Sequence, residues 1–172
     1  ASELFASICL SCIKVESLEA GELGKLANNT YRDVNFALAN QIALMCSKYN
    51  LRAAELIQAC NSGYSRGGLA LPSPGVGGYC LTKDPYMFDL EYKKLTGEIG
   101  LGSVARRVNE RAGLSVVDLV EQYSERYDVK ISNISVAVIG LAFKGSPATS
   151  DLRGSVALEV IDLLKARVKN IK

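Results

Sequence analysis

The stretch from residue 18 to residue 49 most constrains the fold, because no proline interrupts it and its apolar residues recur with helical spacing. Within it, residues 36–45 (FALANQIALM) are apolar on nearly all sides. A helix of this kind is buried over most of its surface, either in a core or against a second subunit. The sequence therefore predicts a mainly α fold built around one long core helix.

Shorter helices are predicted to follow the long one. Residues 52–60 have helical spacing, and Asn50 suits the end of the preceding helix. After a loop rich in Gly, Ser and Pro at 61–80, Asp84 and Pro85 are a typical N-cap and first helical residue. Further helices, the last of them capped by Ser115, are expected over 85–96, 100–112 and 116–127.

The character of the sequence changes at Ile134, where a β-prone run begins that ends before Gly140. Such a run is typical of a buried parallel strand. A loop and a helix from about 153 to 168 follow, and no neighbouring strand is predicted in the rest of the chain. We therefore expect the chain to stop inside a second, α/β domain. The predicted organisation is a lead-in segment, a central helical domain and the truncated start of an α/β domain, at 1–17, 18–130 and 131–172.

Composition excludes several classes of function. Five cysteines, an odd number, fit reduced thiols in a cytoplasmic protein better than a disulfide framework. The chain has no histidine, so Ser-His and Cys-His catalytic pairs are excluded, and Cys9 and Cys12 lack partners for a zinc site. With a net charge of +2 and no basic stripe, nucleic-acid binding is not expected, and no apolar run is long enough to span a membrane.

A polar stripe on the long helix is one candidate for chemistry. Lys25 and Asn29 lie one turn apart within it, so a lysine that stabilises an oxyanion and an asparagine that orients a hydroxyl could meet one bound group. A solvated helix face explains the stripe equally well. Its members are Glu22, Lys25, Asn29, Arg32 and Asn40.

Two loops are the other candidates. Three glycines precede Cys80 and let the backbone approach a ligand, while Lys83 favours the nucleophilic thiolate. The alternative is an inert cysteine that is buried as a small apolar residue, as expected for Cys46 and Cys60 on their helices. The loop from Gly140 to Ser146 matches neither phosphate-binding glycine motif, but its lysine could meet a phosphate at the mouth of a parallel sheet. A simple turn is equally compatible with that loop.

Three segments resemble, in order and at similar spacing, the UDP-glucose/GDP-mannose dehydrogenase family of NAD-dependent nucleotide-sugar 6-dehydrogenases. The first is ELGKLANN at 22–29, the second contains Gly-Gly-x-Cys-x-x-Lys-Asp at 77–84, and the third joins VIGLAFK at 138–144 to SDLRGS at 150–155. The matching residues span most of the chain. Tyr79 stands where relatives often carry His or Ser, which leaves the sugar undetermined.

The resemblance implies roles for eight residues. Cys80 would be the catalytic nucleophile, Lys25 and Asn29 would stabilise oxyanions, and Asp84 with a water would handle protons. Arg66 would reach the substrate of a neighbouring subunit. Gly77, Phe143 and Lys144 would contact the nucleotide sugar.

The resemblance also implies an activity and partners. A UDP-hexose would be oxidised to the UDP-uronic acid in two hydride transfers to NAD, through a thiohemiacetal and a thioester on Cys80. The central helices would form a homodimer. NAD would be bound by an N-terminal domain absent from this sequence, so we expect the chain alone to be inactive. The alternative function is a helical oligomerisation module without chemistry, in which Cys80 is inert.

Overall fold

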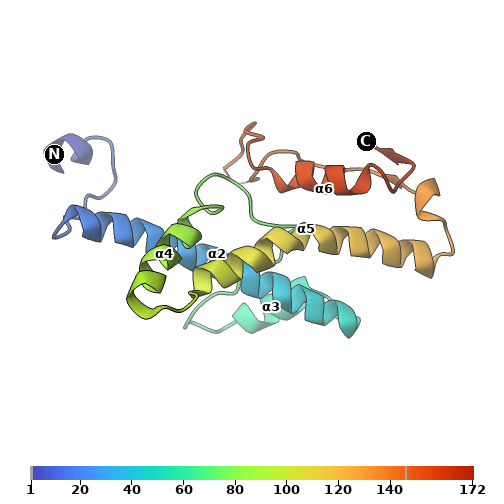
Figure 1. Ribbon diagram of the computed structural model, residues 1–172, viewed down its shortest axis with the longest axis horizontal. Coiled ribbons are helices and arrows are strands. Elements are labelled where there is room, and N and C mark those ends of the chain that lie inside the picture. Colours follow the sequence, from blue (N-terminus) through green and yellow to red (C-terminus); the bar gives the residue numbers. More distant parts are fainter. Residues whose placement is uncertain (1, 146) are drawn as a thin grey trace.

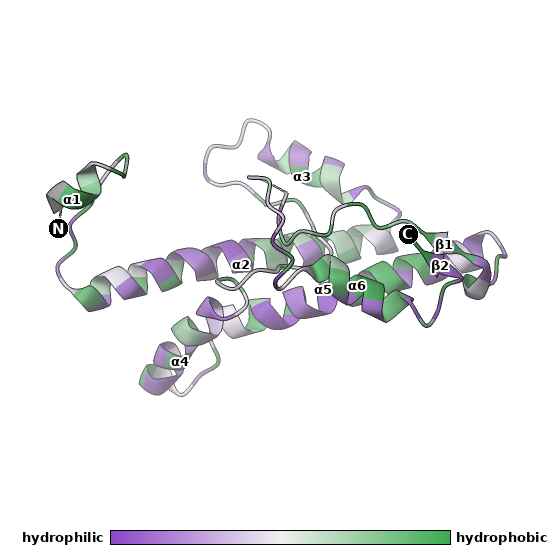
Figure 2. Cartoon of the chain, turned by 90° about the horizontal axis from the view of Figure 1, so that it is seen from above, coloured by the Kyte–Doolittle hydropathy of each residue, from purple (hydrophilic) through white to green (hydrophobic). Residues whose placement is uncertain are grey.

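The computed structural model describes residues 2–145 and 147–172, so Ala1 and Ser146 lie outside it. It is mainly helical, as predicted (Figure 1). Helix α2 runs along the middle of the molecule and packs against α3, α4 and α5, while α6 covers α5 (Figures 1 and 2). The helices are α1 (Ser2–Ala6), α2 (Leu18–Lys48), α3 (Ala53–Asn61), α4 (Asp84–Thr96), α5 (Leu101–Arg126) and α6 (Val156–Leu164).

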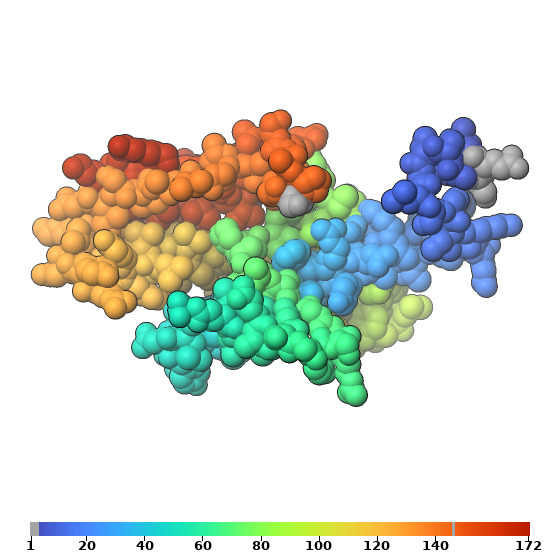
Figure 3. Space-filling model, turned by 180° about the vertical axis from the view of Figure 1, so that it is seen from behind, coloured from blue at the N-terminus to red at the C-terminus, as the bar shows by residue number. Residues whose placement is uncertain are grey.

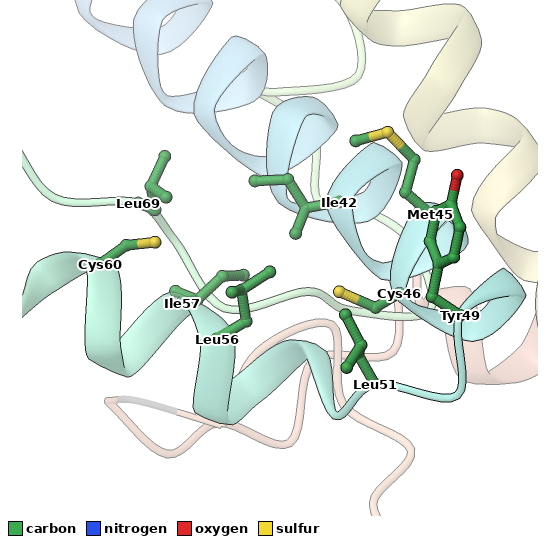
Figure 4. Close-up of a pocket in the computed structure, with 9 residues that line it drawn as sticks. All are labelled: Ile42, Met45, Cys46, Tyr49, Leu51, Leu56, Ile57, Cys60 and Leu69. Atoms are coloured by element: carbon green, nitrogen blue, oxygen red, sulfur yellow. The ribbon is translucent and has the colours of Figure 1, made fainter.

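The long helix is confirmed almost to the residue, but its burial is one-sided. Ser17 caps α2 by accepting a hydrogen bond from the Ala20 amide. The inward face of α2 carries small and polar residues, and the large apolar residues Leu38, Leu44 and Met45 are exposed. An apolar pocket lies between the C-terminal half of α2 and α3, and both Cys46 and Cys60 line it (Figure 4). Cys46 is buried as expected, whereas the expectation that Cys60 is buried was wrong.

Helix α5 is continuous where the sequence predicted two helices. Ser115 lies in its interior and caps nothing. The break was expected near Gly113, but a side chain there would approach the carbonyl oxygen of Pro74 and the side chains of Val160 and Leu163. These distances of 3.7 to 3.8 Å are ordinary van der Waals contacts, so Gly113 is a packed position inside α5 and does not end the helix. The packing of Val117 against Val160 and Leu164 then stabilises the second half of α5.

The strand prediction was partly wrong. Strand β1 is limited to Ser135–Val136 and is preceded by a 3₁₀ turn at Ile131–Asn133. It does have a neighbour within the chain, since β2 (Asn170–Ile171) pairs with it in parallel. The helix expected to reach about residue 168 already ends at Leu164, and strand β2 follows it. The two strands pack with α5 and α6 in one hydrophobic cluster.

The N-terminal segment projects from one end of the molecule, beyond the body of the helices (Figure 3). Its apolar side chains are exposed, among them Ile8, Leu10 and Ile13. No helix in the described ranges is both long and apolar enough to cross a membrane.

Candidate functional site

The buried carboxylate of Asp84 brings three predicted residues together. Its Oδ2 lies 2.5 Å from the Nζ of Lys25 and accepts a hydrogen bond of 2.6 Å from the Nδ2 of Asn29. Its Oδ1 lies 2.6 Å from the Nζ of Lys83. Lys25 and Asn29 come from one face of α2, and Asp84 is the first residue of α4. The polar stripe on α2 is therefore a contact surface in this part of the helix.

Asp84 does not cap α4, although the sequence allowed that role. The N-cap of α4 is Lys83, whose side chain makes no capping hydrogen bond. The Asp84 side chain is fully buried, while those of Lys25 and Lys83 are 52% and 54% exposed. The site is thus a buried acceptor whose two cationic partners face solvent, where a ligand can reach them.

Electrostatics fixes the charges of this cluster. Burial opposes ionisation of Asp84, but hydrogen bonds from Lys25, Lys83 and Asn29 outweigh it and lower the pKa to about 2. The pKa of Lys25 is raised, first by its hydrogen bond to Asp84 and further by electrostatic interaction with Asp84 and Cys80. Near neutral pH the cluster therefore contains a carboxylate and an ammonium group, and the Cys80 thiol lies within range of that ammonium.

Cys80 lies in a turn that leads directly into α4. Its carbonyl oxygen accepts hydrogen bonds from the amides of Lys83, at 3.3 Å, and Asp84, at 2.9 Å. The hydroxyl of Thr82 closes the same turn by donating to the Gly78 carbonyl at 2.9 Å. Cys80 itself is exposed. The turn thus presents an accessible thiol next to the Asp84 cluster.

The segment after β1 packs directly on the glycines that precede Cys80. The Gly78 amide donates to the Gly154 carbonyl at 3.1 Å, and a Cβ atom on Gly77 would collide with that same carbonyl. A Cβ atom on Gly78, whose φ is +87°, would meet the ring of Phe143. The glycines are therefore required by close packing between residues 77–78 and the C-terminal segment.

Side chains of the C-terminal segment reach the same place. Arg153 lies over the ring of Tyr79, with 5.3 Å between its Cζ and the ring centroid. Both carboxylate oxygens of Asp151 accept hydrogen bonds from this guanidinium, Oδ1 from Nε at 2.8 Å and Oδ2 from Nη2 at 2.7 Å. The Nζ of Lys144 lies 5.4 Å from the ring centroid of Phe143. Four predicted residues, Gly77, Cys80, Phe143 and Lys144, are thus gathered around one loop.

Arg66 is not part of this assembly. It lies in the exposed loop after α3, and within the described chain it forms no ion pair. No role was predicted for the Asp33–Arg106 pair in the α2–α5 interface or for Arg153. Arg153 could have been found, because it stands inside the third of the segments that resemble the family.

Among the described residues, the glycine pattern at the start of α5 is not a dinucleotide-binding motif. Gly100, Gly102 and Ala105 follow the spacing of a dinucleotide motif at the start of α5, but no strand precedes them. The carboxylate of Asp89 already occupies this helix N-terminus and accepts from the amides of Gly102, at 3.3 Å, and Ser103, at 2.5 Å. A cofactor phosphate therefore cannot bind there. No cluster of metal-binding side chains occurs within the described ranges either.

Acid should remove stability that depends on Asp84. Its pKa falls from an ordinary 3.8 to about 2 in the folded protein, so the contribution is complete above about pH 4 and is lost as the pH falls through 2. The shift corresponds to about 2 kcal/mol. Urea unfolding between pH 2 and 6 should show the stability gap between wild type and Asp84→Asn closing over this window. Asp33 and Asp151 titrate in both proteins and cancel, and a gap that is constant with pH would contradict the assignment.

Known proteins match the chain over its whole length. The sequence profile of the UDP-glucose/GDP-mannose dehydrogenase family, central domain, matches residues 19–111. The UDP-N-acetyl-D-mannosamine dehydrogenase of Pyrococcus horikoshii is 37% identical over 172 residues, which are 100% of this chain and 40% of that protein. The enzyme of the same name from Escherichia coli K12 is 33% identical over 168 residues, covering 95% of this chain and 39% of the relative.

Solved structures give the same result. The P. horikoshii UDP-D-ManNAc dehydrogenase superposes with a TM-score of 0.85 at 36% identity, covering 98% of this chain and 39% of that one. The UDP-N-acetyl-mannosamine dehydrogenase of Staphylococcus aureus gives 0.76 at 29% identity, covering 98% and 37%. The chain spans about two fifths of the length of these relatives. From the profile, the identities and the shared fold, the chain belongs to the UDP-glucose/GDP-mannose dehydrogenase family.

Proposed function

We propose that this chain carries the catalytic residues of a nucleotide-sugar 6-dehydrogenase, which oxidises C6 of a UDP-sugar to the carboxylate with NAD as the oxidant. The observation that carries the proposal is the exposed thiol of Cys80 beside the Lys25–Asn29–Asp84 cluster. UDP-N-acetyl-D-mannosamine is the proposed substrate, because dehydrogenases named for this nucleotide sugar match nearly the whole chain. The same family includes enzymes named for other nucleotide sugars.

The residues of this chain act at two atoms: the sulfur of Cys80, which bonds to the substrate, and the substrate oxygen, whose negative charge they stabilise. The Cys80 thiolate adds to the C6 aldehyde to form a C–S bond, and the carbonyl oxygen becomes an oxyanion. Lys25 remains protonated because its pKa is raised, so its ammonium stabilises that oxyanion. After oxidation to the thioester, water attacks the carbonyl carbon, the C–S bond breaks and the thiol is regenerated. The hydride acceptor binds outside the residues described.

Asp84 is assigned a positioning role in this scheme. A carboxyl whose pKa is about 2 is a weak base near neutral pH and remains ionised. It fixes the ammonium of Lys25 and the amide of Asn29 at one oxygen, so both groups are held in place without the cost of ordering them during the reaction.

The C-terminal segment and the α2–α3 surface complete the proposal. We propose that residues 131–172 contribute to the nucleotide-sugar site through Phe143 and Lys144, which lie against the Cys80 loop. The exposed apolar residues of α2 and α3 would form a homodimer interface, from which Arg66 reaches the partner's substrate. Sedimentation velocity of the protein checks the dimer, and a monomer at micromolar concentration would contradict it.

The activity is tested with the protein that carries this chain, supplied with NAD and UDP-N-acetyl-D-mannosamine. We expect two NADH for each UDP-uronic acid formed, measured by absorbance and mass spectrometry, because the alcohol is oxidised twice. Parallel reactions with UDP-glucose and UDP-N-acetylgalactosamine identify the preferred sugar. If no nucleotide sugar is oxidised by a protein that still self-associates, the oligomerisation module is the better interpretation.

A further inference from the structure

A network of four buried polar residues crosses the interface between α2 and α5. The Nη1 of Arg106 lies 2.8 Å from Oδ1 of Asp33, and the Nδ2 of Asn109 donates to the same oxygen at 3.0 Å. Asn40, two turns along α2, donates from its Nδ2 to the Oδ1 of Asn109 at 3.0 Å. All four residues are less than 8% exposed. We call this set the buried polar network.

The network ends on the backbone that leads to Cys80. The Ser73 amide donates to Oδ1 of Asn40 at 2.9 Å, and Arg106 donates to the Val76 carbonyl at 3.4 Å. Between these two points the Ser73 hydroxyl donates to the Gly75 carbonyl at 2.7 Å. The segment 73–76 is thus held at both ends by side chains from the helix pair, and Cys80 follows four residues later.

Stability alone does not account for such a network. Burying an ion pair costs desolvation that its attraction often fails to recover, and a well-packed apolar pair is commonly as stable. Two of its buried atoms, Oδ2 of Asp33 and Nε of Arg106, have no hydrogen-bond partner within the described structure. Burial also raises the pKa of Asp33 despite its cationic partner. What polar side chains provide here, and apolar ones cannot, is directional hydrogen bonding to a loop.

We propose that Asn40 and Arg106 are positioning residues, which fix the 73–76 backbone and thereby place the Cys80 thiol against Lys25. The inference rests on the proposed function, because it assigns the network to the reaction at Cys80. Packing on the opposite side of the loop supports the proposal that this segment is held in place. Gly75 leaves no room for a Cβ atom between Val156 and the backbone of α5, so the segment is held on both sides.

The chain contains a matched control. Asn35, also on α2, bridges another part of the same loop, donating to the Gly68 carbonyl at 3.0 Å and accepting from the Ala70 amide at 3.1 Å. The experiment compares Asn40→Ala with Asn35→Ala in the protein that carries this chain. The readouts are the melting temperature, kcat and KM with the nucleotide sugar, and amide hydrogen exchange over residues 68–78.

We expect Asn40→Ala to lower kcat by about tenfold to a hundredfold with a much smaller change in KM, as small misplacements of reacting groups do. Exchange should accelerate at residue 73 and the following glycines. Asn35→Ala should lose protection near residue 70 and keep kcat. If Asn40→Ala does not fold, Arg106→Lys, which keeps the charge beside Asp33 but not the reach to Val76, is measured in its place.

Two outcomes separate this inference from the proposed function. If Cys80→Ser is inactive while Asn40→Ala and Asn35→Ala show the same kcat as wild type, the network is only structural and the inference is overturned. If Cys80→Ser retains full turnover, the proposed function itself fails. Equal losses of kcat in Asn40→Ala and Asn35→Ala, in step with their melting temperatures, would also overturn the inference.

Discussion

Cys80→Ser should stop release of the uronic acid, with a loss of about a thousandfold or more in kcat, as removal of a nucleophile generally causes. A serine hydroxyl is a weak nucleophile unless a base activates it, and the chain contains no histidine to do so. Oxidation of the alcohol to the aldehyde needs no thiol. The variant should therefore still form an aldehyde, which can be captured with hydroxylamine and detected by mass spectrometry.

Cys60→Ser is the matched control for this variant. Cys60 is also exposed and also precedes a loop, but it lies on α3 and lines the apolar pocket away from the Asp84 cluster. We expect it to keep full activity. Wild-type turnover by Cys80→Ser would remove the nucleophile assignment, and loss of aldehyde formation in that variant would show a defect in substrate binding.

Local signals in the sequence predicted the helices well. Helix α2 follows from an uninterrupted helical pattern with a serine before it, and both features act within a few residues. The continuity of α5 and the formation of β2 depend instead on residues that are distant in the sequence. A strand of two residues at Asn170–Ile171 has no local pattern, and it forms because Val136 and the α5–α6 pair lie beside it.

The residues of the site divide in the same way, into those that the local sequence predicts and those whose role depends on tertiary packing. Family-like motifs named Lys25, Asn29, Cys80 and Asp84, and the structure brings the first two to Asp84 across 55 residues of sequence or more. The roles of Asp84 and Asn40 could not be predicted from periodicity. A carboxylate before a proline is also a good helix cap, and a polar residue in a helical stripe is usually solvated. Only tertiary packing shows that both side chains are buried hydrogen-bonding partners.

Lys25→Met should lower kcat by about a hundredfold to a thousandfold, the usual cost of losing one group that stabilises an oxyanion. Methionine keeps much of the length and apolar contact of lysine but carries no charge. Asp84 would still be paired with Lys83 and Asn29, so the fold should persist. The effect is expected in kcat more than in KM, because the oxyanion exists only during the reaction.

Lys83→Met distinguishes this role from simple loss of an ion pair. Lys83 binds the other oxygen of the same carboxylate at 2.6 Å, and its side chain is as exposed as that of Lys25. Both variants should therefore lose similar stability above about pH 4, where Asp84 is ionised, since each removes one cation from it. Urea unfolding measures this loss. If Lys25 acts on the oxyanion, its loss must reduce kcat far more than the loss of Lys83. Equal reductions of kcat would mean that the two lysines serve only to hold Asp84 ionised. The oxyanion would then need another partner, and Asn29 is the next candidate on α2.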